Sequence, residues 1–226
     1  MRNWQHGARI GGPDADWERY AEAFRLAGDR LVQDYLNPPP TPSNLPDDFF
    51  DRVTELQNHP VLDHLRVGYP VLYLYRHSLE LWIKAVFALA SQVVDENQPP
   101  QVTHKLGRAW RPTRDLLSRI FDDEDTATAS AFVEEVVVKF DSLDADSIAL
   151  RYPYRAEEKK RKDSKGQSQG NDKAQKLTLP EVRLEDLINW RDSVRQACSY
   201  LLGFATELEN LLEQRREAVA WGFGVD

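Results

Sequence analysis

Covalent and metal-based cross-links are almost absent from this sequence. Of its 226 residues only one is a cysteine, Cys198, which excludes an intrachain disulfide and a cluster of thiolates around zinc. A chain of this length buries most of its apolar surface without such links, and a lone cysteine at helical spacing is typical of core packing. We therefore expect a cytoplasmic protein that uses no metal and no other cofactor.

Long apolar runs and an excess of positive charge are lacking as well. No segment reaches the roughly 20 uninterrupted apolar residues that a membrane span needs, and residues 1–17 contain no apolar signal core. The net charge is −8 at pH 7 and the isoelectric point is near 5.2. We expect no membrane partner and no general affinity for polyanions, so any contact with nucleic acid requires a local basic surface.

Apolar residues recur three and four apart through most of the chain, which is the period of an amphipathic helix. No repeat of solenoid length is present. The pattern predicts an all-α, up-and-down bundle of five or six helices. The expected helices cover residues 14–36, 47–58, 70–94, 104–121, 123–144 and 184–218.

Several local signals indicate where these helices begin or are interrupted and which segments are not helical. Thr103 is expected to cap the fourth helix and Pro112 to interrupt it, because proline lacks an amide hydrogen. The β-branched run at 133–138 leaves a strand possible within the fifth. Residues 147–155 are expected to be extended, and residues 156–176, which are charged and offer almost nothing to bury, to form a mobile insertion.

The predicted helix at 70–94 is apolar around nearly its whole circumference, which places it at the centre of the bundle. It nevertheless contains Arg76, His77, Glu80 and Lys84, and Arg76, Glu80 and Lys84 fall four apart on one stripe. The favoured interpretation is an internal ion network that fixes the register of the helix. In the alternative, Arg76 and His77 face a cleft or dimer groove and meet a phosphate, with His77 as an acid or base.

Three short motifs occur in a particular order: Glu80 with Lys84, then "THKL" at 103–106, then "RYP" at 151–153, followed by a long closing helix. In this order they resemble the HEPN domains, which are helical bundles found in prokaryotes and in higher eukaryotes. The resemblance covers residues 69–215. It divides the chain into residues 1–68, which pack on the bundle, a HEPN-like bundle at 69–218 with its insertion at 156–176, and a tail at 219–226.

The resemblance also implies a function. HEPN ribonucleases of toxin, CRISPR and phage-defence systems need no metal. At the start of the closing helix they carry an arginine that is followed, after four to six intervening residues, by a histidine. Two copies of this motif meet in a dimer. The corresponding region here, 150–167, contains no histidine. The resemblance therefore implies a homodimer that binds a nucleotide, RNA, or a partner such as a nucleotidyltransferase or another defence-system protein. A diverged ribonuclease toxin and a purely structural interaction module remain alternatives.

The candidate site residues follow from these hypotheses. His104, near a helix start that favours anions, and His77 are the catalytic candidates if the protein is an enzyme. Arg151 and Arg155 flank Tyr152 and Tyr154, a combination of cations and stacking surfaces that suits single-stranded nucleic acid. The expected nucleotide- or RNA-binding residues are Arg76, His77, His104, Arg151, Tyr152 and Arg155.

Three other patterns are weaker. Arg52 and His59 have the nuclease spacing but precede the central helix. The basic run "KKRK" at 159–162 could bind an RNA backbone, although such a run is ordinarily an exposed, solvated segment with no binding role. His59, Asp63 and His64 are too few and too loosely spaced to predict a metal site.

Overall fold

The computed structural model describes residues 16–37, 67–96, 98–99, 103–144, 150, 154–155, 175–176 and 184–221. Within these ranges five helices carry the fold, and the all-α prediction is confirmed. They are α1 (Trp17–Leu36), α4 (Tyr69–Val93), α5 (Leu106–Ile120), α6 (Glu124–Asp144) and α7 (Leu184–Ala220). The two-residue strands β1 (Tyr154–Arg155) and β2 (Gln175–Lys176) pair antiparallel and are the only strands among the described residues.

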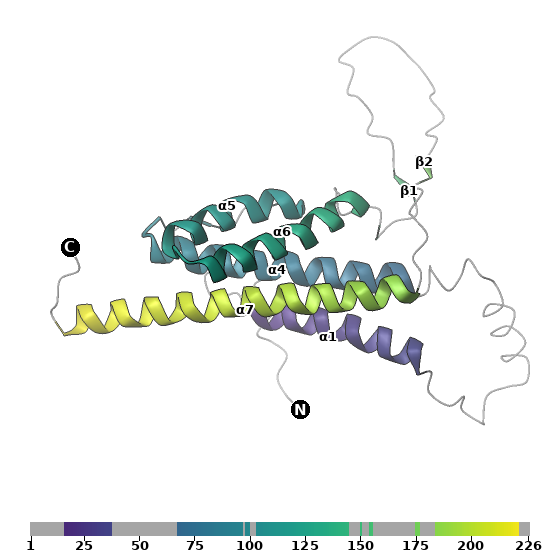
Figure 1. The fold of residues 1–226 in the computed structure, drawn as a ribbon, viewed down its shortest axis with the longest axis horizontal. Helices are drawn as coiled ribbons and strands as arrows, with labels where there is room; N and C mark the ends of the chain where they lie inside the picture. The colour runs from purple at the N-terminus through teal and green to yellow at the C-terminus, as the bar shows by residue number, and fades with distance from the viewer. Residues whose placement is uncertain are drawn as a thin grey trace, which may run out of the picture.

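Helix α4 lies at the centre of the bundle, as its composition predicts. It packs against α1, α5 and α7, and Figure 1 shows it between the α5–α6 pair on one side and α1 with α7 on the other. Its side chains are buried on every side, which explains why the helix is apolar all round. Fully burying an aliphatic side chain such as Leu72, Leu79 or Ile83 contributes about 1.5–3 kcal/mol.

Helix α5 corrects two sequence predictions. It begins at Leu106, so Thr103 is not its N-cap; instead the Thr103 hydroxyl accepts a hydrogen bond from the Lys105 amide at 3.2 Å. Pro112 lies inside a continuous helix rather than interrupting it. Burial of Trp110, two residues before the proline, together with Leu116 and Leu117 of the following turn, outweighs the hydrogen bond that proline cannot donate.

Helix α6 is helical throughout, so the strand that its β-branched run left possible does not form. Asp123 precedes it and accepts the Thr126 amide at 2.7 Å, which is the bond expected of an N-cap. Val133, Val136 and Val137 are buried at helical spacing, and this burial overrides their β propensity. The expected helix at 47–58, the proline-rich stretch and most of the insertion at 156–176 lie outside the described residues.

A buried polar junction joins α1, α4 and α7 through Asp29 of α1. Its carboxylate accepts a hydrogen bond from the Tyr75 hydroxyl of α4 at 2.9 Å and from Nε of Arg195 of α7 at 3.0 Å. Arg25, one turn earlier on α1, forms an ion pair with the same group. The neighbouring Gly28 lets the Tyr75 ring approach, since a Cβ atom at that position would lie 2.6 Å from Cε1 of the ring.

Replacing Asp29 with alanine should lower the free energy of unfolding by roughly 1–3 kcal/mol, because the buried Tyr75 hydroxyl loses its partner. Urea denaturation of both proteins measures the difference. The matched control is Asp34→Ala, which removes an exposed carboxylate paired with Arg30 on the same helix and should change stability by less than about 0.5 kcal/mol. Equal effects at the two positions would show that the Asp29 junction is not stabilising.

Candidate functional site

The carboxylate of Glu80 lies at the centre of a cluster of basic side chains. Its Oε1 atom lies 2.7 Å from Nζ of Lys84 and 3.0 Å from Nδ1 of His104. Its Oε2 atom lies 3.8 Å from Nη1 of Arg76 and 3.9 Å from Nδ1 of His77. The nitrogens of Lys84 and His104 are within hydrogen-bonding distance of the carboxylate, and those of Arg76 and His77 lie beyond it. We call these five residues the Glu80 cluster.

Arg76 is an internal part of the cluster rather than a group that faces a cleft. Its side chain is 1% exposed, and its Nη2 atom donates a hydrogen bond to the carbonyl oxygen of His104 at 2.6 Å. The guanidinium therefore joins α4 to the segment that leads into α5. The favoured prediction, an ion network that fixes α4, describes this geometry, whereas the alternative that Arg76 meets an external phosphate does not.

The solvent edge of the cluster is formed by the two histidines and Lys84. The side chain of His104 is 60% exposed, that of His77 22% and that of Lys84 12%. His77 makes an edge contact with the ring of Phe24 on α1, with centroids 4.4 Å apart, and stacks on Tyr73. His77 is therefore held by aromatic packing, while His104 is the more accessible imidazole.

An aromatic ring borders the same edge. Nζ of Lys84 lies 5.7 Å from the ring centroid of Trp17, at the start of α1, which is within the range of a cation–π contact. The sequence placed Trp17 only on the apolar face of a helix, and nothing in its spacing connects it with a lysine 67 positions later. Trp17 and Tyr73 are thus site residues that sequence reasoning missed.

Two permanent cations, Arg76 and Lys84, face one permanent anion in the cluster. Burial disfavours the charged form of Glu80, but His77, Lys84 and His104 together outweigh it and lower the pKa of Glu80 to about 2 from 4.5. Glu80 is therefore a carboxylate at neutral pH and is not available as a general acid. The cluster keeps an excess of positive charge even when both histidines are neutral.

The start of α5 beside His104 already has an anion. The amide of Gly107 donates to Oδ2 of Asp141 on α6 at 3.0 Å, which places a carboxylate at the positive end of the helix dipole. A Cβ atom at position 107 would lie 2.8 Å from the same oxygen, so glycine permits this approach. The exposed amides that led us to expect anion binding by this helix end are thus partly occupied by the chain itself.

The remaining predicted residues are not brought to the Glu80 cluster. Arg151 and Tyr152 lie outside the described residues, and of Arg155 only the backbone, in β1, is described. The Arg52 and His59 pair, the histidines near position 60 and the basic run at 159–162 also lie outside them. Those predictions stay predictions.

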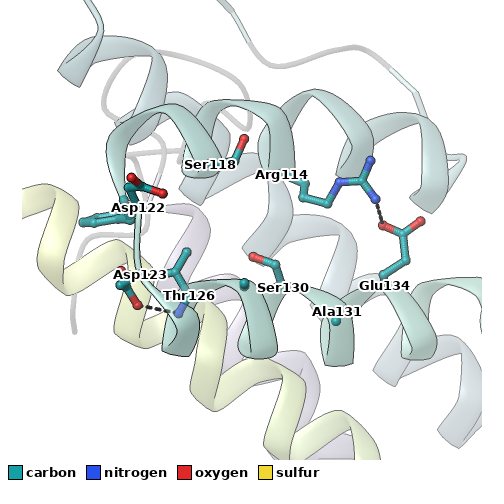
Figure 2. Close-up of a pocket in the computed structure, with 10 residues that line it drawn as sticks. Arg114, Ser118, Asp122, Asp123, Thr126, Ser130, Ala131 and Glu134 are labelled. Atoms are coloured by element: carbon teal, nitrogen blue, oxygen red, sulfur yellow. Dashed lines mark hydrogen bonds and ion pairs between the residues drawn. The ribbon is translucent and has the colours of Figure 1, made fainter.

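A hollow between α5 and α6, of about 470 Å³, has no comparable chemistry. Figure 2 shows Arg114 paired with Glu134 at one end, while at the other end Asp123 accepts a hydrogen bond from the Thr126 amide. The Arg114–Glu134 ion pair has a length of 2.7 Å. These polar groups therefore satisfy one another. We do not assign a function to this hollow.

Comparison of the chain with known protein families, with curated proteins and with solved structures gives no match. In the part of the chain that the structure describes, no helix is long and apolar enough to cross a membrane. No group of three or more histidine, cysteine or acidic side chains among the described residues is placed to hold a metal ion. The function must therefore be argued from the Glu80 cluster itself.

Proposed function

We propose that this protein is a HEPN-like binding protein that takes an anionic group of a nucleotide or RNA at the edge of the Glu80 cluster and carries out no catalysis of its own. The observation that carries the proposal is the convergence of Lys84, His77 and His104 on one carboxylate beside Trp17. The homodimer and the nucleotidyltransferase or other defence-system partner that the HEPN resemblance implies belong to the same proposal.

The charge of the cluster supports an anionic ligand. Arg76 neutralises part of the Glu80 charge from inside, so the charge of Lys84 is not fully compensated. A phosphate that arrived from solvent would meet His104 first, without the desolvation that access to Arg76 would require. The half-buried Trp17 ring offers a surface on which a base can stack beside Lys84.

A ribonuclease is the second candidate, because the Glu80 to His104 contact orients an imidazole that is 60% exposed. A carboxylate that holds one ring nitrogen leaves the other for proton transfer, as in other acid–base sites. General acid–base catalysis contributes about 10²- to 10⁴-fold, so His104→Ala should abolish any such activity. Incubation of purified protein with total cellular RNA, without added metal, separates this candidate from the binder.

The binding proposal predicts that adenosine triphosphate or a short single-stranded RNA raises the melting temperature of the wild-type protein. Trp17→Ala should weaken the measured affinity about tenfold, since stacking of one base contributes about 1–3 kcal/mol. His104→Ala should weaken it and reduce its dependence on salt. Fluorescence anisotropy with a labelled RNA and thermal shift with the nucleotide measure both effects.

The matched controls are Trp221→Ala and Arg30→Ala, which change an exposed tryptophan and an exposed cation away from the cluster. Both should bind as the wild type does. Circular dichroism shows whether each variant is folded. If the wild type binds neither probe, or if folded Trp17 and His104 variants bind as tightly as the controls, the proposal is wrong and the cluster is architectural only.

A further inference from the structure

A groove of about 730 Å³ lies between α1 and α7, and none of the residues of the Glu80 cluster lines it. Helix α4 contributes the buried Trp82 to this groove. Leu26 of α1 and Leu202 of α7 also line it and are 52% and 49% exposed, although both are large apolar side chains. The volume is within the range of ligand sites, and a ligand with an apolar part can cover the two leucines.

Five charged side chains also line the groove, and four of them have a partner within the chain. Arg25 and Arg195 share the carboxylate of Asp29, and Arg25 also pairs with Glu22. The third arginine, Arg19, pairs with a carboxylate that does not line the groove. These four charges are therefore compensated without a ligand.

Glu18, the fifth charged residue, has no cation. Its side chain is half-buried, and no ion pair or side-chain hydrogen bond among the described residues includes it. Burial, together with the nearby carboxylates of Glu209 and Asp16, raises the pKa of Glu18. A half-buried carboxylate beside other carboxylates is unfavourable unless a cation pairs with it. The groove therefore lacks one positive charge at the start of α1.

The buried side of the groove has a hydrogen-bond donor that is not satisfied. Trp82 is 3% exposed, and its Nε1 atom is buried without a hydrogen-bond partner in the part of the chain that the structure describes. A buried indole N–H group usually has a partner, because leaving it unpaired is costly. Nε1 is covered, so an acceptor reaches it when a side chain of the groove wall changes rotamer, as is common on binding.

The spacing of these features matches an extended peptide. Glu18 and Leu26 are eight residues apart on α1, which is about 12 Å along the helix axis. Four residues of extended chain span about 13 Å, and side chains four apart point to the same side. The carbonyl oxygens of a helix are already bonded within it, whereas those of an extended segment are free to accept the Trp82 N–H.

We infer that the α1–α7 groove binds an extended peptide segment of a partner protein. A lysine or arginine of the segment pairs with Glu18, a large apolar side chain four residues away covers Leu26 and Leu202, and a backbone carbonyl accepts from Nε1 of Trp82. The inference rests on the uncompensated charge, the unpaired donor and the exposed leucines. It does not depend on ligand binding at the Glu80 cluster, and either can fail alone.

A phage-displayed library of short random peptides, selected on the immobilised full chain, tests the inference. The enriched peptides should share a basic residue and a large apolar residue four positions apart. Fluorescence anisotropy with a labelled enriched peptide then measures the affinity of each variant. Glu18→Gln should weaken binding about tenfold or more, because it removes a charged partner. Trp82→Phe, which removes the N–H group but keeps an aromatic ring, should weaken it about three- to tenfold.

The matched control is Glu217→Gln, which changes an exposed carboxylate of α7 outside the groove and should bind as the wild type does. Because Glu18 has no cation to lose, Glu18→Gln should be at least as stable in urea as the wild type. Glutamine in place of the basic residue of the peptide should weaken binding to the wild type but have little further effect on Glu18→Gln. If no peptide is enriched, or if enriched peptides bind the folded Glu18 and Trp82 variants as tightly as the control, the inference is wrong.

Discussion

Replacing Glu80 with alanine is expected to destabilise the bundle by roughly 3–5 kcal/mol, because it leaves the buried Arg76 and the partly buried Lys84 without their common anion. The loss should exceed that of an ordinary ion pair, since the side chain of Glu80 is 2% exposed and water cannot replace it. Urea denaturation followed by circular dichroism measures the change in the free energy of unfolding.

Glu135→Ala is the matched control for this substitution. Glu135 and Lys139 have the same spacing on α6, four residues with glutamate first, at 2.6 Å, but both are largely exposed. Their loss should change stability by less than about 0.5 kcal/mol. If the two substitutions destabilise the protein equally, the Glu80 cluster does not stabilise the fold.

The lowered pKa of Glu80 gives the same prediction a pH dependence. The folded protein holds this carboxylate with a pKa of about 2, below the ordinary value of 4.5, so the unfolded chain binds the proton more readily. The stabilisation is therefore complete above about pH 4.5 and is lost as the pH falls toward 2. The difference in stability between wild type and Glu80→Ala should narrow over that window.

Trp110→Ala is the other substitution with a large expected effect, a loss of roughly 3–5 kcal/mol. Trp110 is 1% exposed on α5, and its Nε1 donates to Oε2 of Glu134 on α6 at 2.9 Å. The change leaves a cavity and also removes a hydrogen bond between the two helices. Chemical denaturation with tryptophan-independent detection, by far-ultraviolet circular dichroism, measures it.

The same substitution at Trp221 provides the control. Trp221 follows the last turn of α7 and is 79% exposed, so Trp221→Ala should alter stability by less than about 0.5 kcal/mol. Comparable losses at the two positions would contradict the placement of Trp110 in the core.

Hydrophobic spacing predicted the fold well because most helices bury one stripe, and α4, which is buried all round, has an unmistakable composition. Local signals predicted the helix ends less well. Pro112 is normally a helix breaker, but the burial of its neighbours is a tertiary effect that the sequence around it does not report. The start of α5 likewise depends on Asp141, 34 residues away from Gly107.

The site was predictable to the extent that it lies within one helix. Arg76, Glu80 and Lys84 are linked by the geometry of α4, so their spacing revealed them. Trp17 belongs to a different helix, and no local pattern connects it to Lys84. The burial of Arg76 also depends on α1 and on the segment before α5, which together cover this part of α4.

Helix α7 is the last element in chain order, yet it packs against α1, α4 and α6. During synthesis, α4 can be covered by α1 and α5 while its remaining flank stays open until residues 184–208 have left the ribosome. A nascent chain of this protein therefore exposes part of its most apolar helix for a long interval. Its dependence on chaperones should be greatest before the closing helix emerges.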